Sequence, residues 1–250
     1  DRDLRATGYT LRFHKLESNR AYDLHTLHYH YDALSRLVNA DYHPGANPTG
    51  TPFREYAYQY DGVGNRTRET MTVEGVPTIT NWTYNGMNQI SSGGVTYDAA
   101  GRMTSDGVNP FTWDRADRLL SMGGLGYTYN GLGQRVGQSH NGLVTSYLND
   151  LQPGLVKLLN SDTEGDLTWY LHTPMGIHQQ QNPDQSWVYP VQDGLGSVRA
   201  VVDAAGQILE SRLYAPYGDP FGGSGEAQTG FGFTGEQTDA SGLVYLRARY

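Results

Sequence analysis

A short template recurs six times between residues 31 and 135, and it constrains the fold more than any other feature of the sequence. Each copy has an aromatic residue, then Asp or Asn, two variable positions, a small turn-forming residue, and usually Arg, Asn or Gln. The six aromatic–Asx pairs are Tyr31-Asp32, Tyr60-Asp61, Tyr84-Asn85, Tyr97-Asp98, Trp113-Asp114 and Tyr129-Asn130. Successive copies begin 13 to 29 residues apart. This variable spacing excludes a strict solenoid and favours strand repeats joined by loops of unequal length.

The template predicts a β-turn between two strands. Asp or Asn at the first position and Gly at the fourth are the favoured ends of a type I turn, and the Asx side chain can accept a backbone N–H two residues on. The fourth position must tolerate left-handed backbone as the chain enters the next strand. The residues there are Ser35, Gly64, Asn88, Gly101, Asp117 and Gly133. The same pattern predicts turns at Asp162–Gly165, Asp193–Gly196, Asp203–Gly206 and Asp239–Gly242.

A second regularity precedes each turn. A large residue stands two positions before each repeat aromatic, as in Tyr58/Tyr60 and Phe111/Trp113. A spacing of two places both side chains on one face of a strand. Each unit is therefore interpreted as strand, turn, strand with one aromatic face. The predicted fold class is all-β, with antiparallel hairpin repeats in one continuous sheet and almost no helix.

Composition excludes several classes of function. The 250 residues carry a formal net charge of −8 with no basic stripe, which argues against a nucleic-acid or anionic-membrane partner. No apolar run approaches the roughly 18 residues of a membrane span, and no signal-peptide pattern occurs. The absence of Cys excludes disulfides and thiolate zinc sites.

The repeat resembles the YD repeat of the Rhs (rearrangement hotspot) family, and the last 60 residues resemble the Rhs repeat-associated core domain. The matching stretches begin with Asp193-Gly194-Leu195-Gly196-Ser197-Val198-Arg199. They continue with Tyr214-Ala215-Pro216-Tyr217-Gly218 and Phe231-Gly232-Phe233-Thr234-Gly235, and end with Leu243-Val244-Tyr245-Leu246-Arg247-Ala248-Arg249-Tyr250. We therefore expect a repeat region over residues 1–190 and a core domain over residues 191–250.

The resemblance implies a β-sheet wound as a spiral into a hollow shell around a C-terminal effector, as in bacterial polymorphic toxins. It also implies an Asp-Pro self-cleavage segment, which we expect beyond Tyr250. We accordingly assign no catalytic residue, no cofactor and no enzymatic activity to this chain. The repeat turns and aromatics are expected to be structural, as are the core-domain positions Asp193, Gly194, Gly196, Ser197, Tyr217, Gly218, Arg247, Arg249 and Tyr250.

Candidate chemistry outside the repeats is sparse. His28 and His30 would share a strand face opposite Leu27, Tyr29 and Tyr31, but no carboxylate stands at a helpful spacing, so we predict no metal site. Most Asp residues occupy first turn positions, which explains them without the paired carboxylates of a glycoside hydrolase.

The sequence thus predicts a structural segment of a secreted or cell-surface, bacterial protein, part of a shell that encloses an effector or of an extracellular repeat assembly. Its expected partners are the remainder of the shell and an enclosed effector, or other copies through sheet edges. The alternative is an extracellular carbohydrate-binding or adhesion protein that uses the aromatic sheet faces.

Overall fold

The computed structural model describes residues 8–11, 25–45, 50–151 and 155–247. The chain divides into two compact units, Asp1–Val95 and Thr96–Tyr250, which are described separately below. The predicted boundary between residues 190 and 191 concerns sequence families rather than compactness, and it stays a prediction.

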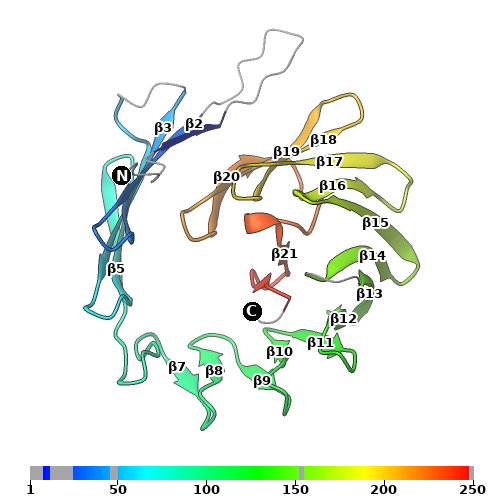
Figure 1. The fold of residues 1–250 in the computed structure, drawn as a ribbon, viewed down its shortest axis with the longest axis horizontal. Coiled ribbons are helices and arrows are strands. Elements are labelled where there is room, and N and C mark those ends of the chain that lie inside the picture. The colour runs from blue at the N-terminus through cyan, green and yellow to red at the C-terminus, as the bar shows by residue number, and fades with distance from the viewer. Residues whose placement is uncertain (1–7, 12–24, 46–49, 152–154, 248–250) are drawn as a thin grey trace. The chain divides into compact units, whose positions relative to one another are not determined.

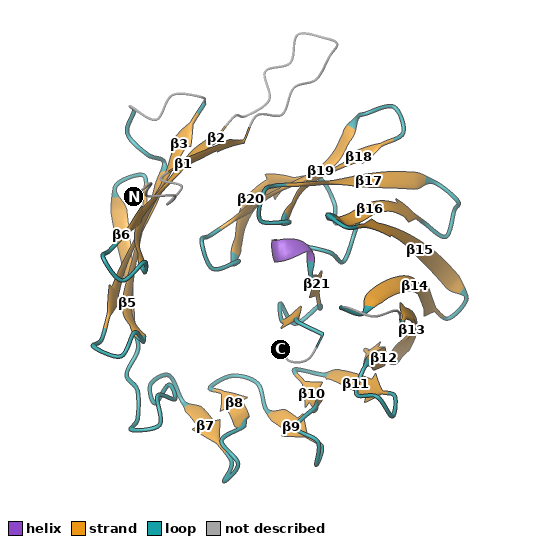
Figure 2. Cartoon of the chain, in the orientation of Figure 1, coloured by secondary structure: helices purple, strands orange, loops and turns teal. Residues whose placement is uncertain are grey.

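The predicted all-β class is confirmed. Strands joined as antiparallel hairpins make up nearly all regular structure of the described residues, which contain no α-helix and one short 3₁₀ turn, η1 (Phe233–Gly235) (Figure 2). The described part of the chain also contains no helix long and apolar enough to cross a membrane.

The first unit contains a six-stranded sheet in sequence order. Its strands are β1 (Gly8–Leu11), β2 (His25–Tyr31), β3 (Leu37–Pro44), β4 (Arg54–Tyr60), β5 (Arg66–Val73) and β6 (Val76–Asn81). The register pairs Leu27 with Tyr42 and Ala40 with Tyr56, so these buried residues share one face. The rings of Tyr42 and Tyr56 meet edge to face at 5.8 Å. The predicted aromatic face is thus the core of this unit, while His28 and His30 lie on the other face.

The second unit is built on a twelve-stranded sheet, again in sequence order (Figure 1). Its strands are β9 (Phe111–Trp113), β10 (Leu119–Met122), β11 (Leu125–Tyr129), β12 (Arg135–His140), β13 (Leu143–Asp150), β14 (Lys157–Thr163), β15 (Asp166–Thr173), β16 (Gly176–Gln181), β17 (Trp187–Gln192), β18 (Val198–Asp203), β19 (Ile208–Tyr214) and β20 (Pro220–Ser224). Beyond it lies the C-terminal segment, residues 226–247, with η1 and the small pair β21 (Gln237–Thr238) and β22 (Val244–Tyr245).

The twelve-stranded sheet curves around the C-terminal segment (Figure 1). Arg135 on β12 binds Asp239, and Arg212 on β19 binds the carbonyl of Phe231. Seven strand spacings would separate β12 from β19 by roughly 34 Å in a flat sheet, and the eight residues from Phe231 to Asp239 would span about 28 Å only if fully extended, with the arginine side chains bridging the rest. The segment also folds back on itself where the N–H of Gly232 donates to the carbonyl of Glu236. One short segment therefore reaches both strands because the sheet bends toward it.

The buried apolar side chains of the second unit form two clusters on the face toward the C-terminal segment. The larger contains Leu158, Ile177, Val188, Val198, Val201 and Phe231. The smaller contains Leu119, Met122, Leu125 and Tyr127, with Leu243 packed against it. Because both clusters include or contact residues of the C-terminal segment, this segment completes the core rather than lying outside it.

The prediction of one continuous sheet is wrong. In the chain segment that joins β6 to β9, β7 (Val95–Tyr97) and β8 (Met103–Asp106) form a separate pair of strands. Residues 82–94 contribute only the bridge between Tyr84 and Ile90. The repeat units are shortest here, so that turns take up most of their residues and strands of three or four residues remain.

The two ends of the repeat hairpins carry different turns. The Asx turns occupy one end, as predicted, and two-residue turns with positive φ at both positions occupy the other, at Glu74-Gly75, Gly123-Gly124 and Asn141-Gly142. Positive φ at both positions is the type I′ geometry that matches strand twist. The type I turn predicted for Asp162–Gly165 is wrong for this reason. Thr163 pairs with Asp166, and Glu164 and Gly165 have φ of 54° and 100°.

Candidate functional site

The repeated Asp organises its turn through both carboxylate oxygens. At Asp98, the backbone carbonyl accepts the N–H of Gly101 at 3.0 Å and the backbone N–H donates to the carbonyl of Arg102 at 2.9 Å. The side-chain Oδ1 accepts the N–H groups of Ala100 and Arg102 at 2.9 and 3.0 Å. The Nε of Arg102 donates to Oδ2 at 2.7 Å. This network explains why the template has Asp first, a small residue fourth and Arg fifth.

The other five repeat turns have the same backbone geometry. Their first residues are Asp32, Asp61, Asn85, Asp114 and Asn130. The fourth residues all have positive φ, between 59° and 97°: Ser35, Gly64, Asn88, Gly101, Asp117 and Gly133. Where the first residue is Asn, its Nδ2 donates to the Oε1 of a Gln at the fifth position, as from Asn130 to Gln134 at 2.7 Å. Asn–Gln thus replaces Asp–Arg without changing the turn.

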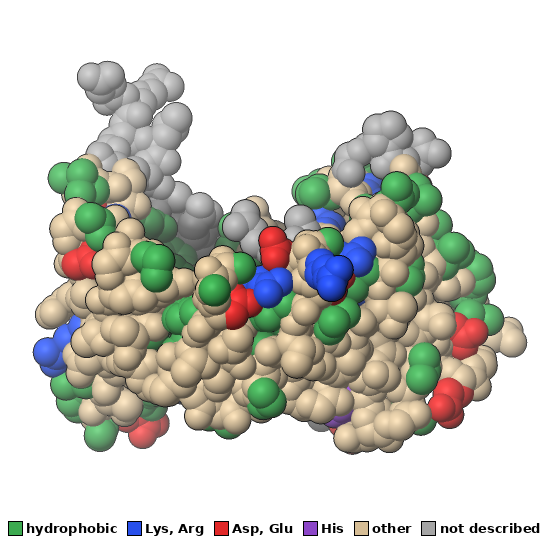
Figure 3. Space-filling model, turned by 90° about the horizontal axis from the view of Figure 1, so that it is seen from below, with side chains coloured by type: hydrophobic (Ala, Val, Ile, Leu, Met, Phe, Trp, Pro, Cys, Tyr) green, Lys and Arg blue, Asp and Glu red, His purple; other side chains and the backbone are tan. Residues whose placement is uncertain are grey.

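The fifth residue also binds the next turn along the chain. In the first unit, Nη1 of Arg36 donates to the carbonyl of Asp61 at 3.3 Å. In the second, Arg102 and Arg118 donate in the same way to the carbonyls of Asp114 and Asn130, at 2.8 and 3.1 Å. Consecutive turns within each unit are therefore tied together by side chains, in addition to the strand ladders. In the centre of the face shown in Figure 3, acidic and basic side chains accordingly lie next to one another.

The repeat aromatics fasten each unit to the one before it. The hydroxyls of Tyr60, Tyr84 and Tyr129 and the indole N–H of Trp113 donate to backbone carbonyls of the preceding unit, at 2.6 to 2.8 Å. Arginines cover several of these rings, as Arg36 covers Tyr60 at 4.9 Å from the ring centroid. Tyr31 and Tyr97 end β2 and β7 at the corresponding position. These polar tips and ring faces are engaged within the sheet.

The turn network favours the charged form of its carboxylates. The backbone N–H of Arg36 lowers the pKa of Asp32, and that of Arg118 lowers the pKa of Asp114. Side-chain hydrogen bonds from Asn65 and Arg102 lower the pKa values of Asp61 and Asp98. The turns are thus most stable when their aspartates are ionised.

The core-domain turn at Asp193 receives the C-terminal segment. Asp193 forms the same turn with Gly196, and its Oδ2 accepts Nε of Arg199 at 2.7 Å. The hydroxyl of buried Ser197 accepts the N–H of Thr234 at 2.9 Å, and the N–H of Val198 donates to the carbonyl of Gly232. The turn therefore presents the hydroxyl and strand start on which residues 232–234 dock.

Two further core-domain positions also contact this segment or its surroundings. Gly218 has φ of 103°, and a Cβ there would lie 2.7 Å from the Phe233 ring. Tyr217 precedes it in the same turn and is half exposed. Gly194 lies in the Asp193 turn with open space around it, so nothing in the structure requires glycine there. Arg249 and Tyr250 lie outside the described residues.

A buried ion pair anchors the far end of the C-terminal segment. Arg135 and Asp239 side chains are 1% and 3% exposed, and Nη1 lies 2.8 Å from both carboxylate oxygens. The Tyr245 ring lies 4.1 Å from the guanidinium carbon. Its hydroxyl accepts the N–H of Arg135 and donates to the carbonyl of Arg247. A charge buried this deeply is tolerated because it is paired with an opposite charge.

A second, largely buried pair anchors the near end, with Glu210 buried and Arg212 partly exposed. Arg212 on β19 pairs with Glu210 through Nε and Nη2, and its Nη1 and Nη2 donate to the carbonyls of Phe231 and Thr229 at 2.7 and 2.8 Å. Glu210 in turn accepts the N–H of Gln228. Together with Arg135–Asp239, this pair fixes the C-terminal segment at both ends.

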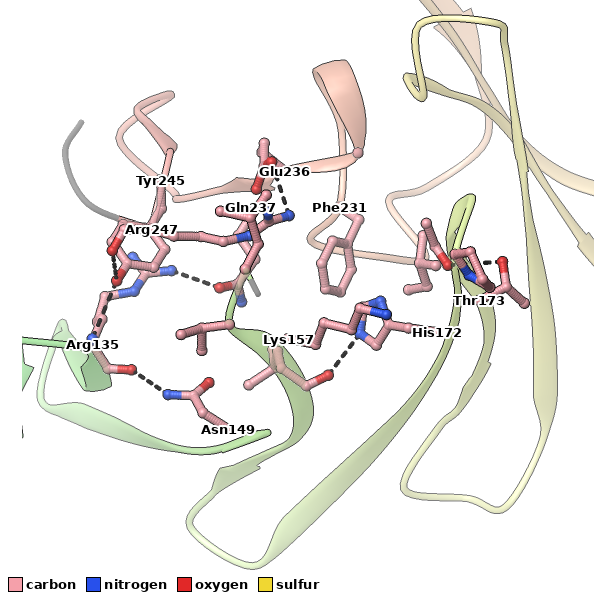
Figure 4. Close-up of a pocket in the computed structure, with 17 residues that line it drawn as sticks. Arg135, Asn149, Lys157, His172, Thr173, Phe231, Glu236, Gln237, Tyr245 and Arg247 are labelled. Atoms are coloured by element: carbon pink, nitrogen blue, oxygen red, sulfur yellow. Dashed lines mark hydrogen bonds and ion pairs between the residues drawn. The ribbon is translucent and has the colours of Figure 1, made fainter. Parts of the chain in front are cut away.

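Between these anchors lies a cavity of about 190 Å³, bounded by the C-terminal segment and strands β12 to β16 (Figure 4). Nε2 of His172 lies 2.8 Å from the carbonyl of Leu158, and burial lowers the pKa of His172. Burial raises the pKa of Glu236, which pairs with Arg247 at 2.9 Å. The Phe231 ring lies across His172 at 5.6 Å. The docked segment thus forms one wall of the cavity, and several groups that line the cavity hold this segment in place.

The sequence indicated the turn at Asp239 but not its partner. Arg135 stands 104 residues before Asp239, at the start of β12. Nothing in the sequence after the Asn130 turn marks it as the partner of Asp239. Glu210 and Arg212 gave no turn or repeat signal. Their one recognisable feature is that these two opposite charges stand two residues apart, which places both side chains on the same face of a strand.

Comparison with known proteins agrees with this geometry. The family model described as Teneurin YD-shell matches residues 13–250. Two similar curated proteins are the tRNA3(Ser)-specific nuclease WapA of Bacillus spizizenii, 29% identical, and the tRNA nuclease WapA of Bacillus subtilis strain 168, 28% identical. Each match covers 88% of this chain but 10% of the relative, so the chain spans about a tenth of their length.

Solved structures share the fold. The Photorhabdus luminescens Tc holotoxin pore aligns with a TM-score of 0.69 at 20% identity, over 90% of this chain and 13% of the other. The TcdB2-TccC3-Cdc42 crystal structure aligns with a TM-score of 0.66 at 18% identity, over 90% and 14%. The family match covers almost the whole chain and accords with the Rhs-like repeat, the curved antiparallel sheet and the docked C-terminal segment. The chain therefore belongs to the Teneurin YD-shell family.

Proposed function

We propose that this chain is a wall segment of an Rhs-type shell that encloses a C-terminal effector. The observation that carries the proposal is the position of residues 226–247, which lie on the concave face of the twelve-stranded sheet. Buried ion pairs at Arg135–Asp239 and Glu210–Arg212 hold the segment there. A chain that continues past residue 247 would start from the concave side.

The shell proposal divides the chain as the sequence suggested. Residues 1–190 supply repeated wall, and the core domain, residues 191–250, adds the last wall strands, β18 to β20, before the chain turns inward at residues 226–247. The partners are the remainder of the shell and the enclosed effector, and the location is the exterior or surface of a bacterium. The names of the relatives are those of nucleases and toxin assemblies, which fits an effector carried elsewhere in the longer protein. We assign no catalysis to this segment.

The structure gives no support to a carbohydrate-binding role for the repeat aromatics. Trp113 donates its indole N–H to the carbonyl of Met103, and Trp82 lies under the Arg66 guanidinium at 4.6 Å. Stacking on a sugar requires a free ring face. The repeat aromatics therefore serve the sheet.

Protease accessibility tests the shell proposal. In the longest natural polypeptide that contains this segment, a protease recognition sequence is inserted directly after Tyr250. The matched control carries the same insertion in the exposed turn at Asn141-Gly142, between β12 and β13. We expect rapid cutting at the control site, protection after Tyr250 in the native protein, and equal cutting of both once the protein is denatured. Equal cutting in the native protein would exclude an enclosed C-terminal continuation.

A further inference from the structure

One face of the six-stranded sheet gathers imidazoles and carboxylates from three neighbouring strands. The register pairs His28 on β2 with Asp41 on β3, and Asp41 with Glu55 on β4. His30 and His43 belong to the same face, because each stands two residues from a member of this row. None of these groups belongs to the repeat turns or to the C-terminal anchors.

The contacts within this cluster already join its members in pairs. The rings of His28 and His43 lie 5.6 Å apart, centroid to centroid. Two imidazoles that share one tetrahedral zinc ion at Zn–N of about 2.1 Å have centroids roughly 5 Å apart. Nε2 of His30 lies 3.4 Å from Oδ2 of Asp41. Such an arrangement leaves Oδ1 of Asp41 available while His30 orients the carboxylate.

Two potential ligand atoms are buried without a hydrogen-bond partner. His43 is 5% exposed. Among the described residues, neither Nδ1 of His43 nor Oδ1 of Asp41 has a hydrogen-bond partner. A buried polar atom without a partner costs about 1–3 kcal/mol. Both atoms are already stripped of water, and coordination to an ion would satisfy them together.

The charge of the cluster also favours a cation. Asp41 and Glu55 are directly opposed across β3 and β4, a placement in which like charges destabilise a sheet. Among the described residues, neither carboxylate forms an ion pair with Lys or Arg. With neutral imidazoles, the cluster carries two negative charges that a divalent ion would balance.

We propose that His28, Asp41 and His43, with Glu55 completing the set, bind one divalent transition-metal ion such as zinc. Mixed imidazole and carboxylate donors suit zinc and its neighbours better than calcium or magnesium. As the side chains stand, no three of these groups converge closely enough to hold an ion. The same is true of every other group of His, Asp and Glu side chains in the described part of the chain. Side-chain rotation closes the site, because directly opposed residues have Cβ atoms only about 5 Å apart. The ion would cross-link β2, β3 and β4.

Cobalt binding tests the site on the complete 250-residue chain, freed of any affinity tag and treated with a chelator. Co²⁺ should bind with one-to-one stoichiometry and give the visible absorption of a low-symmetry site, and Zn²⁺ should displace it. Binding should weaken at least about tenfold in His28→Gln and in Asp41→Asn. The matched control His178→Gln removes an exposed imidazole from β16 and should change the affinity less than about twofold.

A second measurement needs no variant. Of the eight histidines, Co²⁺ should broaden the imidazole NMR signals of His28, His30 and His43 and leave those of His140, His172 and His178 unchanged. The proposal is overturned by the absence of saturable one-to-one binding. It is equally overturned by full affinity in folded His28→Gln and Asp41→Asn, or by broadening centred on the histidines of the second unit.

Discussion

At the scale of single residues, the fourth position of each Asx turn matters because of its backbone rather than its contacts. Gly64 and Gly133 have φ of 97° and 82°, and a Cβ at either would meet nothing within 4 Å, while Gly101 has the same positive φ of 82°. Ser35, Asn88 and Asp117 adopt the same conformation at a steric cost that glycine avoids. The fourth position is therefore a conformational requirement that sequence alone could identify.

Replacing Gly101 with Val should lower the free energy of unfolding by more than about 1 kcal/mol, because a β-branched residue is poorly tolerated at positive φ. Urea unfolding measures the effect. The matched control is Gly131→Val, in the second position of the Asn130 turn, where φ is not positive and space is open. Equal losses in both variants would show that turn entropy, and not the left-handed conformation, makes glycine necessary.

The Arg135–Asp239 pair should be far more sensitive than the turn pairs. Arg135→Met leaves a buried carboxylate unpaired, which costs about 3–5 kcal/mol, whereas Arg102→Met breaks a partly exposed pair that solvent screens and should cost far less. The double variant Arg135→Met/Asp239→Leu should regain much of the loss. Thermal melts of the three variants decide the matter, and similar losses from Arg135→Met and Arg102→Met would contradict the burial argument.

At the scale of elements, the turn, rather than the strand, is the unit that repeats. Strands of the two large sheets range from three to eight residues, yet the five-residue Asx turn keeps its hydrogen bonds throughout. The aspartates that begin the repeat turns, Asp32, Asp61, Asp98 and Asp114, have lowered pKa values. The turns therefore share one response to acid.

Stability should fall as the pH drops below about 4. The turn aspartates have folded pKa values below their ordinary value of 3.8, so the unfolded chain binds more protons in this range. Their contribution is complete above the unfolded pKa and is lost as the pH falls through the folded pKa. Urea midpoints across the acid range measure it. In Asp98→Asn/Asp114→Asn the dependence should be shallower, and an unchanged slope would place the acid sensitivity elsewhere.

Elements that depend on local chemistry could be predicted, and elements that depend on distance could not. The Asx turns and the aromatic strand faces follow from spacing and turn propensity. The type I′ turn at Glu164-Gly165 was missed because Asp162 offered a competing turn start two residues earlier. The Arg135–Asp239 pair and the approach of Asp41 to His28 arise from strand pairing, which a linear pattern does not specify.

At the scale of the whole chain, the sheets end in exposed strands. The six residues of β6 are all exposed, and β6 is the last strand of its sheet among the described residues. It contains Val76 and Ile79, with Pro77 as its one residue without a backbone donor. Unpaired, β-prone edges are templates for pairing with another chain.

The isolated 250-residue chain should therefore self-associate in a concentration-dependent way, which light scattering can follow. Ile79→Lys on the β6 edge should reduce association without lowering the melting temperature, because Ile79 is half exposed. The control Val108→Lys alters a more exposed apolar residue outside any strand and should leave association unchanged. A monomer with a sharp melt at tens of micromolar would mean that the edges are already protected.

The segregation of turn types has a consequence for how such a chain can vary. The Asp–Arg contacts that tie one repeat to the next lie at one end of the hairpins, and type I′ turns close the other end. Adding one residue to each strand at the type I′ end lengthens a hairpin without shifting the side chains below it. Insertions and engineered tags beside Asn141-Gly142 should thus leave the protein folded, whereas insertions beside Asp98–Arg102 should destabilise it. The length of the strands can therefore change while the spacing between repeats stays constant.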